Sequence, residues 1–193
     1  MQDFKKYIVP LVDNEAMGCG FFIRDYFITA GHMFDEAETH TIYFNGAYHT
    51  FNRADAVFLK SFKDGASDVE TQDIAIFKFE GVDSPLRFSD KIPSANTALT
   101  NISFIPVSNC INPFDTLITD CIVTRPLFNF FECKTSNILK RGSSGSPLII
   151  DNIVYGILSG CLDDVNHPDN ILFCSTLNLL SYNRVFSRTS YSP

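Results

Sequence analysis

Short runs in which apolar and polar residues alternate predict a chain built mainly from β-strands. The runs are bounded by Gly, Pro, Asn and Asp, as is typical of strands joined by turns. Hairpin turns are predicted near Arg24 and Asp25 and around Gly46. In the first part of the chain the segments with this pattern are 7–12, 21–29, 41–45, 48–53 and 57–60.

The segment that opens at Asp73 differs from these, because apolar side chains occupy both of its faces. Ala75 and Phe77 would share one face, and Ile74 and Ile76 would share the other. A strand that is buried on both faces is typical of the wall of a β-barrel.

The segment 86–96 contains several polar residues and a proline, and it predicts a linker between two parts of the chain. The regular spacing of strands after this linker is typical of a second all-β unit. The segments predicted as strands there are 98–107, 116–124, 128–134, 146–150 and 153–159.

The end of the chain has the spacing of a helix. Leu179 and Phe186 would lie on one face of a helix over about 176–188, and we expect this face to pack against the second all-β unit. Ser175 or Thr176 could cap its first turn.

Composition limits the classes of function. A length of 193 residues with 45% hydrophobic and 13% aromatic residues is sufficient for one large domain with sizeable cores, which excludes disorder. The formal charge of −7 argues against nucleic acid and against an anionic membrane as partners, whereas a basic peptide would be attracted. No run of 18 apolar residues predicts a membrane span.

Targeting and cysteine patterns suggest the compartment. The first apolar run is interrupted by Pro10 and Asp13, so it is too short for the core of a signal peptide, and we expect a cytoplasmic protein. The six cysteines are then expected to be reduced thiols. No pair has Cys-x-Cys or Cys-x-x-Cys spacing, and no motif predicts a metal site or a cofactor.

The segment 142–147 carries the most distinctive chemistry, with the sequence GSSGSP. A serine hydroxyl attacks a carbonyl when a base takes its proton and backbone donors stabilise the oxyanion. We interpret Ser144 as such a nucleophile. Gly142 would permit a tight turn that directs its own N–H and that of Ser144 to one point, and Gly145 would leave room for a substrate. Alone, a Gly- and Ser-rich turn before an apolar strand is a common loop.

Two other segments supply the partners that such a serine needs. His32 follows a predicted strand, and Asp73 opens the strand that is buried on both faces. Asp64 and Asp68 compete with Asp73, but both fall in a polar loop, whereas the acid must be held rigidly to accept the Nδ1–H of the histidine. The order His, Asp, Ser is that of the chymotrypsin fold. An α/β-hydrolase is excluded, because it has another order and needs glycine where this chain has Ser146.

With these three blocks the chain resembles the trypsin-like serine proteases of the chymotrypsin fold, and most closely their HtrA-type bacterial and viral branches. Members carry Thr-Ala-Ala-His or Thr-Asn-Xaa-His where this chain has TAGH at 29–32, and Asp-Ile-Ala-Leu where it has DIAI at 73–76. They carry Gly-Xaa-Ser-Gly-Gly-Pro or Gly-Xaa-Ser-Gly-Ser-Pro where it has 142–147. The resemblance spans residues 19–160 in outline.

The resemblance implies an all-β fold of two six-stranded antiparallel Greek-key β-barrels with a C-terminal helix. The chain would be a single trypsin-like peptidase domain, with barrels at about 7–85 and 97–175 on either side of the predicted linker.

The resemblance also implies a serine endopeptidase. Ser144 would attack a peptide carbonyl, His32 would take and return the proton, and Asp73 would orient His32. The N–H groups of Gly142 and Ser144 would form the oxyanion hole. The alternative is a catalytically silent pseudoprotease that acts as a peptide- or protein-binding scaffold. A polypeptide is the expected partner, and by analogy a regulatory protein would restrain such an enzyme in the cytoplasm.

Departures from the family pattern bear on specificity and activation. Ile138 lies where trypsins hold the aspartate that selects Lys or Arg, and the segment 156–158 lacks the histidine with which related viral proteases select Gln or Glu. An apolar or small residue in the primary pocket is therefore expected. Ser143 replaces the aspartate that binds a newly cut N-terminal amine in zymogen-type proteases, so we do not expect that activation. The backbone expected to pair with the substrate as an added strand is that of Leu158, Ser159 and Gly160.

Overall fold

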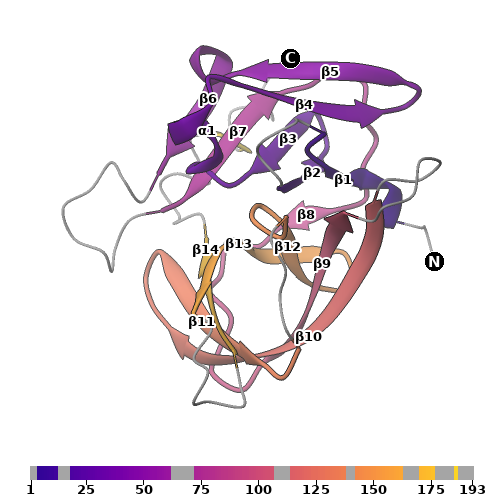
Figure 1. Ribbon diagram of the computed structural model, residues 1–193. Coiled ribbons are helices and arrows are strands. Elements are labelled where there is room, and N and C mark those ends of the chain that lie inside the picture. Colours follow the sequence, from indigo (N-terminus) through magenta and orange to yellow (C-terminus); the bar gives the residue numbers. More distant parts are fainter. Residues whose placement is uncertain are drawn as a thin grey trace, which may run out of the picture.

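The computed structural model describes residues 4–12, 18–61, 72–106, 114–137, 142–162, 170–176 and 185–186. Nearly all of its regular secondary structure is β-strand, and the strands form two halves, one above the other in Figure 1. None of the described helices is long and apolar enough to cross a membrane.

The N-terminal half is a five-stranded antiparallel sheet and a hairpin. Leu11, just beyond β1, pairs with Ile42 of β4 in a single bridge that joins the two sheets. Short helices η1 (Lys5–Tyr7), α1 (Met33–Glu36) and η2 (Arg53–Asp55) lie between strands. The sheet has the order β1 (Ile8–Pro10), β2 (Cys19–Ile23), β3 (Tyr26–Thr29), β7 (Ile74–Lys78) and β6 (Ala56–Lys60), and the hairpin pairs β4 (Thr39–Phe44) with β5 (Ala47–Asn52).

The C-terminal half is a closed antiparallel barrel, because β12 pairs with β9 on one side and with β13 on the other. Around the barrel the strands are β12 (Pro147–Ile150), β9 (Ala98–Pro106), β10 (Phe114–Pro126), β11 (Phe130–Thr135), β14 (Asn170–Ser175) and β13 (Ile153–Leu162).

The prediction of an all-β chain in two halves is confirmed. In detail the two halves differ, since the C-terminal barrel is a continuous ring of six strands, whereas in the N-terminal half the Leu11 bridge joins a sheet to a hairpin. The segment predicted as a linker contains β8 (Arg87–Phe88), which pairs in parallel with β13.

A cluster of phenylalanines fills the N-terminal half. Phe22 is fully buried, and its ring centroid lies 4.3 Å from that of Phe44 and 5.3 Å from that of Phe27. Both faces of β7 are buried, with Ile76 and Phe77 on opposite sides, as the sequence pattern predicts. The C-terminal barrel has a smaller core of Leu99, Cys121, Val123, Phe131, Cys133, Leu148, Leu158, Leu172 and Cys174.

The end of the chain, predicted as a helix, is described at only a few residues. Of the predicted helix, the structure describes Thr176, which is not helical, and the helical residues Val185 and Phe186. The Phe186 ring meets the ring of Tyr26 edge-on at 5.4 Å, and the Tyr26 hydroxyl donates to the Val185 carbonyl oxygen at 3.3 Å. This pair therefore packs against β3 of the first half, and Leu179, the other residue named for the predicted helical face, lies outside the described residues.

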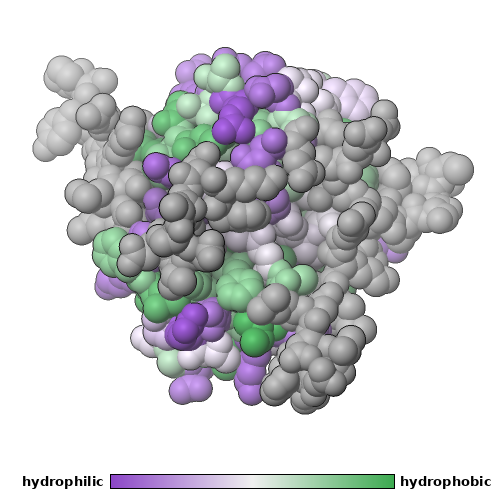
Figure 2. Space-filling view, turned by 60° about the vertical axis from the view of Figure 1, so that its left-hand side comes forward, coloured by the Kyte–Doolittle hydropathy of each residue, from purple (hydrophilic) through white to green (hydrophobic). Residues whose placement is uncertain are grey.

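Large apolar side chains also reach the surface. On the face shown in Figure 2, hydrophobic residues come to the surface in both halves between polar ones. Such scattered exposure is normal for a folded protein. Among the described residues the exposed large apolar side chains are Tyr43, Tyr48, Val57, Ile118, Ile122, Phe128, Ile153 and Ile171.

The phenylalanine cluster predicts a large difference between two matched substitutions. Phe22→Ala should lower the free energy of unfolding by about 3–5 kcal/mol, because it leaves a cavity among packed rings. Phe128→Ala should change it by about 0.5 kcal/mol or less, since Phe128 is 71% exposed. Urea unfolding followed by circular dichroism measures both, and equal losses would contradict the assignment of the core.

Candidate active site

The candidate base, His32, directly follows β3. The chain turns at Gly31 and His32 and enters α1 at Met33. A Cβ atom added at Gly31 would overlap the backbone carbonyl of Lys60, so this turn accepts only glycine. The close approach of the Gly31 and Lys60 backbones therefore fixes the position of the adjacent His32.

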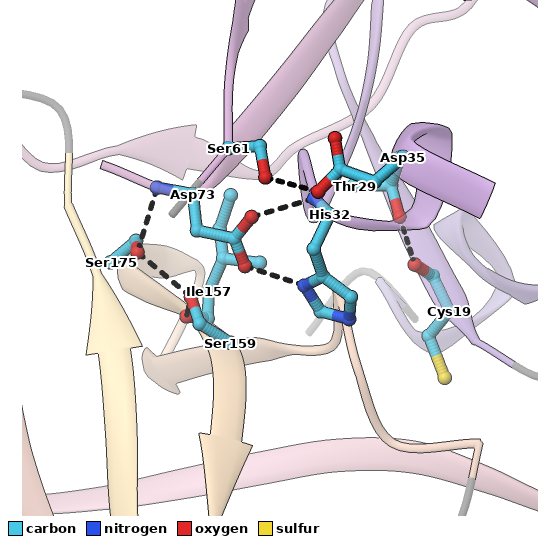
Figure 3. Close-up of polar contacts among 9 residues, drawn as sticks. All are labelled: Cys19, Thr29, His32, Asp35, Ser61, Asp73, Ile157, Ser159 and Ser175. Atoms are coloured by element: carbon cyan, nitrogen blue, oxygen red, sulfur yellow. Dashed lines mark hydrogen bonds and ion pairs between the residues drawn. The ribbon is translucent and has the colours of Figure 1, made fainter. Parts of the chain in front are cut away.

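The acid, Asp73, is 1% exposed and lies immediately before β7. Its Oδ2 is 2.7 Å from Nδ1 of His32, and its Oδ1 accepts the backbone N–H of His32 at 2.7 Å (Figure 3). A carboxylate only accepts, so Nδ1 donates to Asp73, and Nε2 points away from Asp73. The competing Asp64 and Asp68 lie outside the described residues.

Residues of the C-terminal half form hydrogen bonds with Asp73 and its neighbour. The backbone N–H of Asp73 donates to Oγ of Ser175 at 3.0 Å, and this hydroxyl lies 2.8 Å from Oγ of Ser159 (Figure 3). The neighbouring Gln72 donates through Nε2 to the carbonyl oxygen of Thr176 at 2.6 Å. These contacts connect the end of β14 to the residue that orients His32.

The candidate nucleophile lies in a turn that enters β12. Ser143 and Ser146 are buried, whereas Ser144 is half-buried, so Ser144 is the serine of this turn that reaches the surface. The carbonyl oxygen of Ser143 accepts the N–H of Ser146 at 3.1 Å and its hydroxyl at 2.6 Å. In a trans peptide the N–H points opposite to the C=O, so the Ser144 N–H is directed out of the turn.

Polar side chains of β9 anchor this turn from inside the barrel. Asn101 donates through Nδ2 to Oγ of Ser146 at 2.8 Å and to the carbonyl oxygen of Pro147 at 3.1 Å. The hydroxyl of Ser143 donates to that of Ser103 at 3.3 Å, and both residues are buried. A neutral pair of hydroxyls thus occupies the position next to the nucleophile.

The turn is docked on the strands that lead to the histidine. The backbone N–H of Cys19 donates to the carbonyl oxygen of Ser144 at 2.7 Å. Gly145 has a φ of +82°, and an added Cβ atom would overlap the carbonyl oxygen of Cys19 and the hydroxyl of Thr29. The structure therefore brings the Ser144 turn against β2 and β3, the strand pair that ends just before His32.

The strand expected to bind substrate is β13. Leu158 is 2% exposed, its N–H donates to the carbonyl oxygen of Ser146 at 2.9 Å, and its own carbonyl oxygen accepts the N–H of Gly145 at 2.8 Å. Ser159 lies in a β-bulge. A Cβ atom added at Gly160 would meet none of the described residues within 4 Å.

Two further predictions concern the primary pocket and metal binding. Ile138, the residue expected to line the primary pocket, lies outside the described residues. In the part of the chain that the structure describes, no group of three or more His, Cys, Asp or Glu side chains is arranged to hold a metal ion.

Neither a protein-family model nor a curated protein matches the chain. Solved structures do match. Mouse neuropsin, a serine protease, aligns at 13% identity and a TM-score of 0.68 over 97% of this chain and 95% of its own. Tobacco etch virus protease in complex with product aligns at 15% and 0.64 over 97% and 82%. The serine protease of a human pathogenic astrovirus aligns at 14% and 0.60 over 92% and 93%.

Neuropsin and the astrovirus enzyme are serine proteases, and the tobacco etch virus protein is a protease. At this level of identity the likeness establishes the fold. The chain has the chymotrypsin fold. The narrower placement beside the HtrA-type branch stays a prediction.

Sequence reasoning missed the residues that support the site. Ser175 was considered as a helix cap, but it lies in β14 and binds the backbone of a residue 102 positions away. Asn101 and Cys19 carried no local signal either, since their partners in the 142–147 turn are distant in sequence. Pairing across such distances leaves no periodicity that a sequence pattern could reveal.

The docking of the turn predicts contrasting effects of two glycine substitutions on stability. Gly145→Ala should lower the free energy of unfolding by more than about 2 kcal/mol, because of its positive φ and the overlap with Cys19. Gly160→Ala should change it by about 0.5 kcal/mol or less, since its added methyl group meets none of the described residues. Thermal unfolding of both variants gives the comparison, and equal stability would refute the close packing at Gly145.

Burial of the thiols predicts which cysteines react. Burial raises the pKa of Cys19 and Cys121 to about 12 and raises that of Cys174 as well. At pH 8 these thiols stay protonated, and the thiolate is the reactive form. In the native protein, N-ethylmaleimide should therefore modify the exposed Cys161 and leave these three intact, as read by peptide mass spectrometry. Modification of Cys19 before Cys161 would contradict the burial.

Proposed function

We propose that the protein is a serine endopeptidase that works through Ser144, His32 and Asp73. The observation that carries the proposal is the His32–Asp73 pair, in which both carboxylate oxygens are bonded to His32 and the pair lies next to strands on which the Ser144 turn is docked. This arrangement holds the imidazole in the tautomer that can accept a proton through Nε2. The similarity in fold to the serine proteases neuropsin and the astrovirus enzyme supports the same interpretation.

The reaction is acyl transfer. Nε2 of His32 takes the proton of Ser144 as Oγ bonds to the peptide carbonyl carbon, and Asp73 stabilises the imidazolium that results. The protonated His32 then gives its proton to the leaving amine as the C–N bond breaks, which leaves an acyl-enzyme on Ser144. Water repeats the sequence, with His32 as its base, and releases the carboxylic acid.

The oxyanion would be held by the N–H groups of Gly142 and Ser144. The Ser143 carbonyl oxygen is turned inward to Ser146, and this supports an outward Ser144 N–H. Gly142 has a φ of +104°, a conformation that a side chain would disfavour and that a tight turn at this point requires.

The substrate would be a polypeptide that pairs with β13. The N–H and C=O of Leu158 are already bonded within the protein. The substrate backbone would therefore pair with Ser159 and Gly160, where no described residue lies within 4 Å of an added Cβ atom at Gly160. We further propose cleavage after an apolar or small residue, which rests on Ile138 in the primary pocket. The net charge of −7 would favour basic groups elsewhere in the peptide. A cytoplasmic location and restraint by a regulatory protein belong to the same proposal.

The test is covalent labelling of the serine. A fluorophosphonate probe should add once to the wild type and to Ser94→Ala, which changes an exposed serine, and should not add to Ser144→Ala. Intact mass and peptide mapping identify the adduct. Asp73→Asn should lower the rate of casein hydrolysis by about 10⁴, because it favours the wrong tautomer of His32.

Two outcomes would oppose the proposal. An adduct that persists in Ser144→Ala would place the reactive group elsewhere. A folded wild type that is neither labelled nor able to hydrolyse casein, yet binds peptide as well as Ser144→Ala does, would favour the scaffold alternative.

A further inference from the structure

Cys19, the first residue of β2, joins the two halves at the nucleophile turn. Its backbone N–H donates to the carbonyl oxygen of Ser144 at 2.7 Å, and its thiol donates to the carbonyl oxygen of Gly142 at 3.0 Å. Its own carbonyl oxygen accepts the hydroxyl of Thr29 at 2.6 Å (Figure 3). One fully buried residue of the N-terminal half therefore holds two carbonyl groups of the turn.

These carbonyl groups belong to the residues whose N–H groups would bind the oxyanion. Only the rotations φ and ψ separate the N–H of a residue from its own carbonyl, so anchoring the carbonyl restricts the direction of the N–H. Ser144 has a second restraint, because the Ser143 carbonyl in the preceding peptide is bonded to Ser146. Gly142 has the freedom of a glycine at positive φ, and the Cys19 thiol binds its carbonyl oxygen.

The thiol is suited to donate a hydrogen bond and not to react. Burial raises the pKa of Cys19 to about 12, and a hydrogen bond with the backbone of Phe104 lowers it in part. The sulfur is therefore protonated at neutral pH, and a protonated thiol is a donor, as the contact with the Gly142 carbonyl requires.

We propose that Cys19 is a positioning residue for the oxyanion hole, acting through the bond from its thiol to the carbonyl oxygen of Gly142. The proposal rests on the proposed function of Ser144. Loss of this bond should leave peptide binding intact and slow the step in which negative charge develops on the substrate oxygen. Removing a direct oxyanion donor costs about 10²–10³ in rate, and we expect a smaller effect, about tenfold, for a residue that acts through Gly142.

The experiment compares wild type, Cys19→Ala, Cys19→Ser and Cys121→Ala. Cys121 is also a buried cysteine, and its thiol contacts the carbonyl oxygen of Thr119 at 3.7 Å, away from the turn, so it controls for the loss of a buried sulfur. The second-order rate of fluorophosphonate labelling should fall about tenfold in Cys19→Ala and stay within about threefold of wild type in Cys19→Ser, whose hydroxyl can still donate. It should be unchanged in Cys121→Ala.

A split of kinetic constants separates positioning from general loss of structure. With casein as substrate, Cys19→Ala should lower kcat about tenfold while KM stays within about twofold of wild type. The melting temperature of each variant shows that it is folded. Should Cys19→Ala fail to fold, Cys19→Ser alone decides: retained labelling supports the proposal, and labelling tenfold slower overturns it.

The outcomes distinguish the two proposals. Labelling of folded Cys19→Ala at the wild-type rate overturns the role of Cys19 and leaves the proposed function standing. Equal slowing of Cys19→Ala and Cys19→Ser, or equal slowing of Cys121→Ala, also overturns it, because the hydrogen bond would then not be the cause. No labelling of any protein, wild type included, overturns the proposed function and the role of Cys19 with it.

Discussion

A buried carboxylate loses its hydration, and other groups must replace it. The site depends on the groups that do so for Asp73. An ionised group removed from water is costly unless hydrogen bonds replace its solvation. Here one residue supplies both bonds, because His32 binds one oxygen through its backbone and the other through its ring. The solution that satisfies the charge therefore also orients the imidazole. The same two hydrogen bonds therefore stabilise the buried carboxylate and fix the orientation of the His32 ring.

The site belongs to neither half alone. The acid and the histidine stand on the N-terminal half, but Asp73 takes support from Ser175 at the end of β14. The serine stands on the C-terminal barrel, but its turn is bonded to Cys19 of β2. Because each half binds a candidate site residue of the other, a small shift between the halves would change the Asp73–Ser175 and Ser144–Cys19 distances together.

The sequence was informative where the signal is local. Strands, turns and the blocks around His32, Asp73 and Ser144 follow from spacing within short windows, and their order led to the correct fold. The sequence did not predict contacts between residues that are far apart along the chain. The hydrogen bond between Ser175 and Asp73 depends on strand register, which a sequence pattern does not contain. The packing of Phe186 on Tyr26 was not predicted for a similar reason, since helical spacing gives a face but not the surface that it meets.

The hydrogen bond between Ser143 and Ser103 has a consequence for how the site comes to exist. A hydroxyl pair carries no charge, so it forms without a cleaved terminus or a change of pH to neutralise it. The turn that carries Ser144 is thus held by neutral side chains of β9, a strand of the C-terminal barrel.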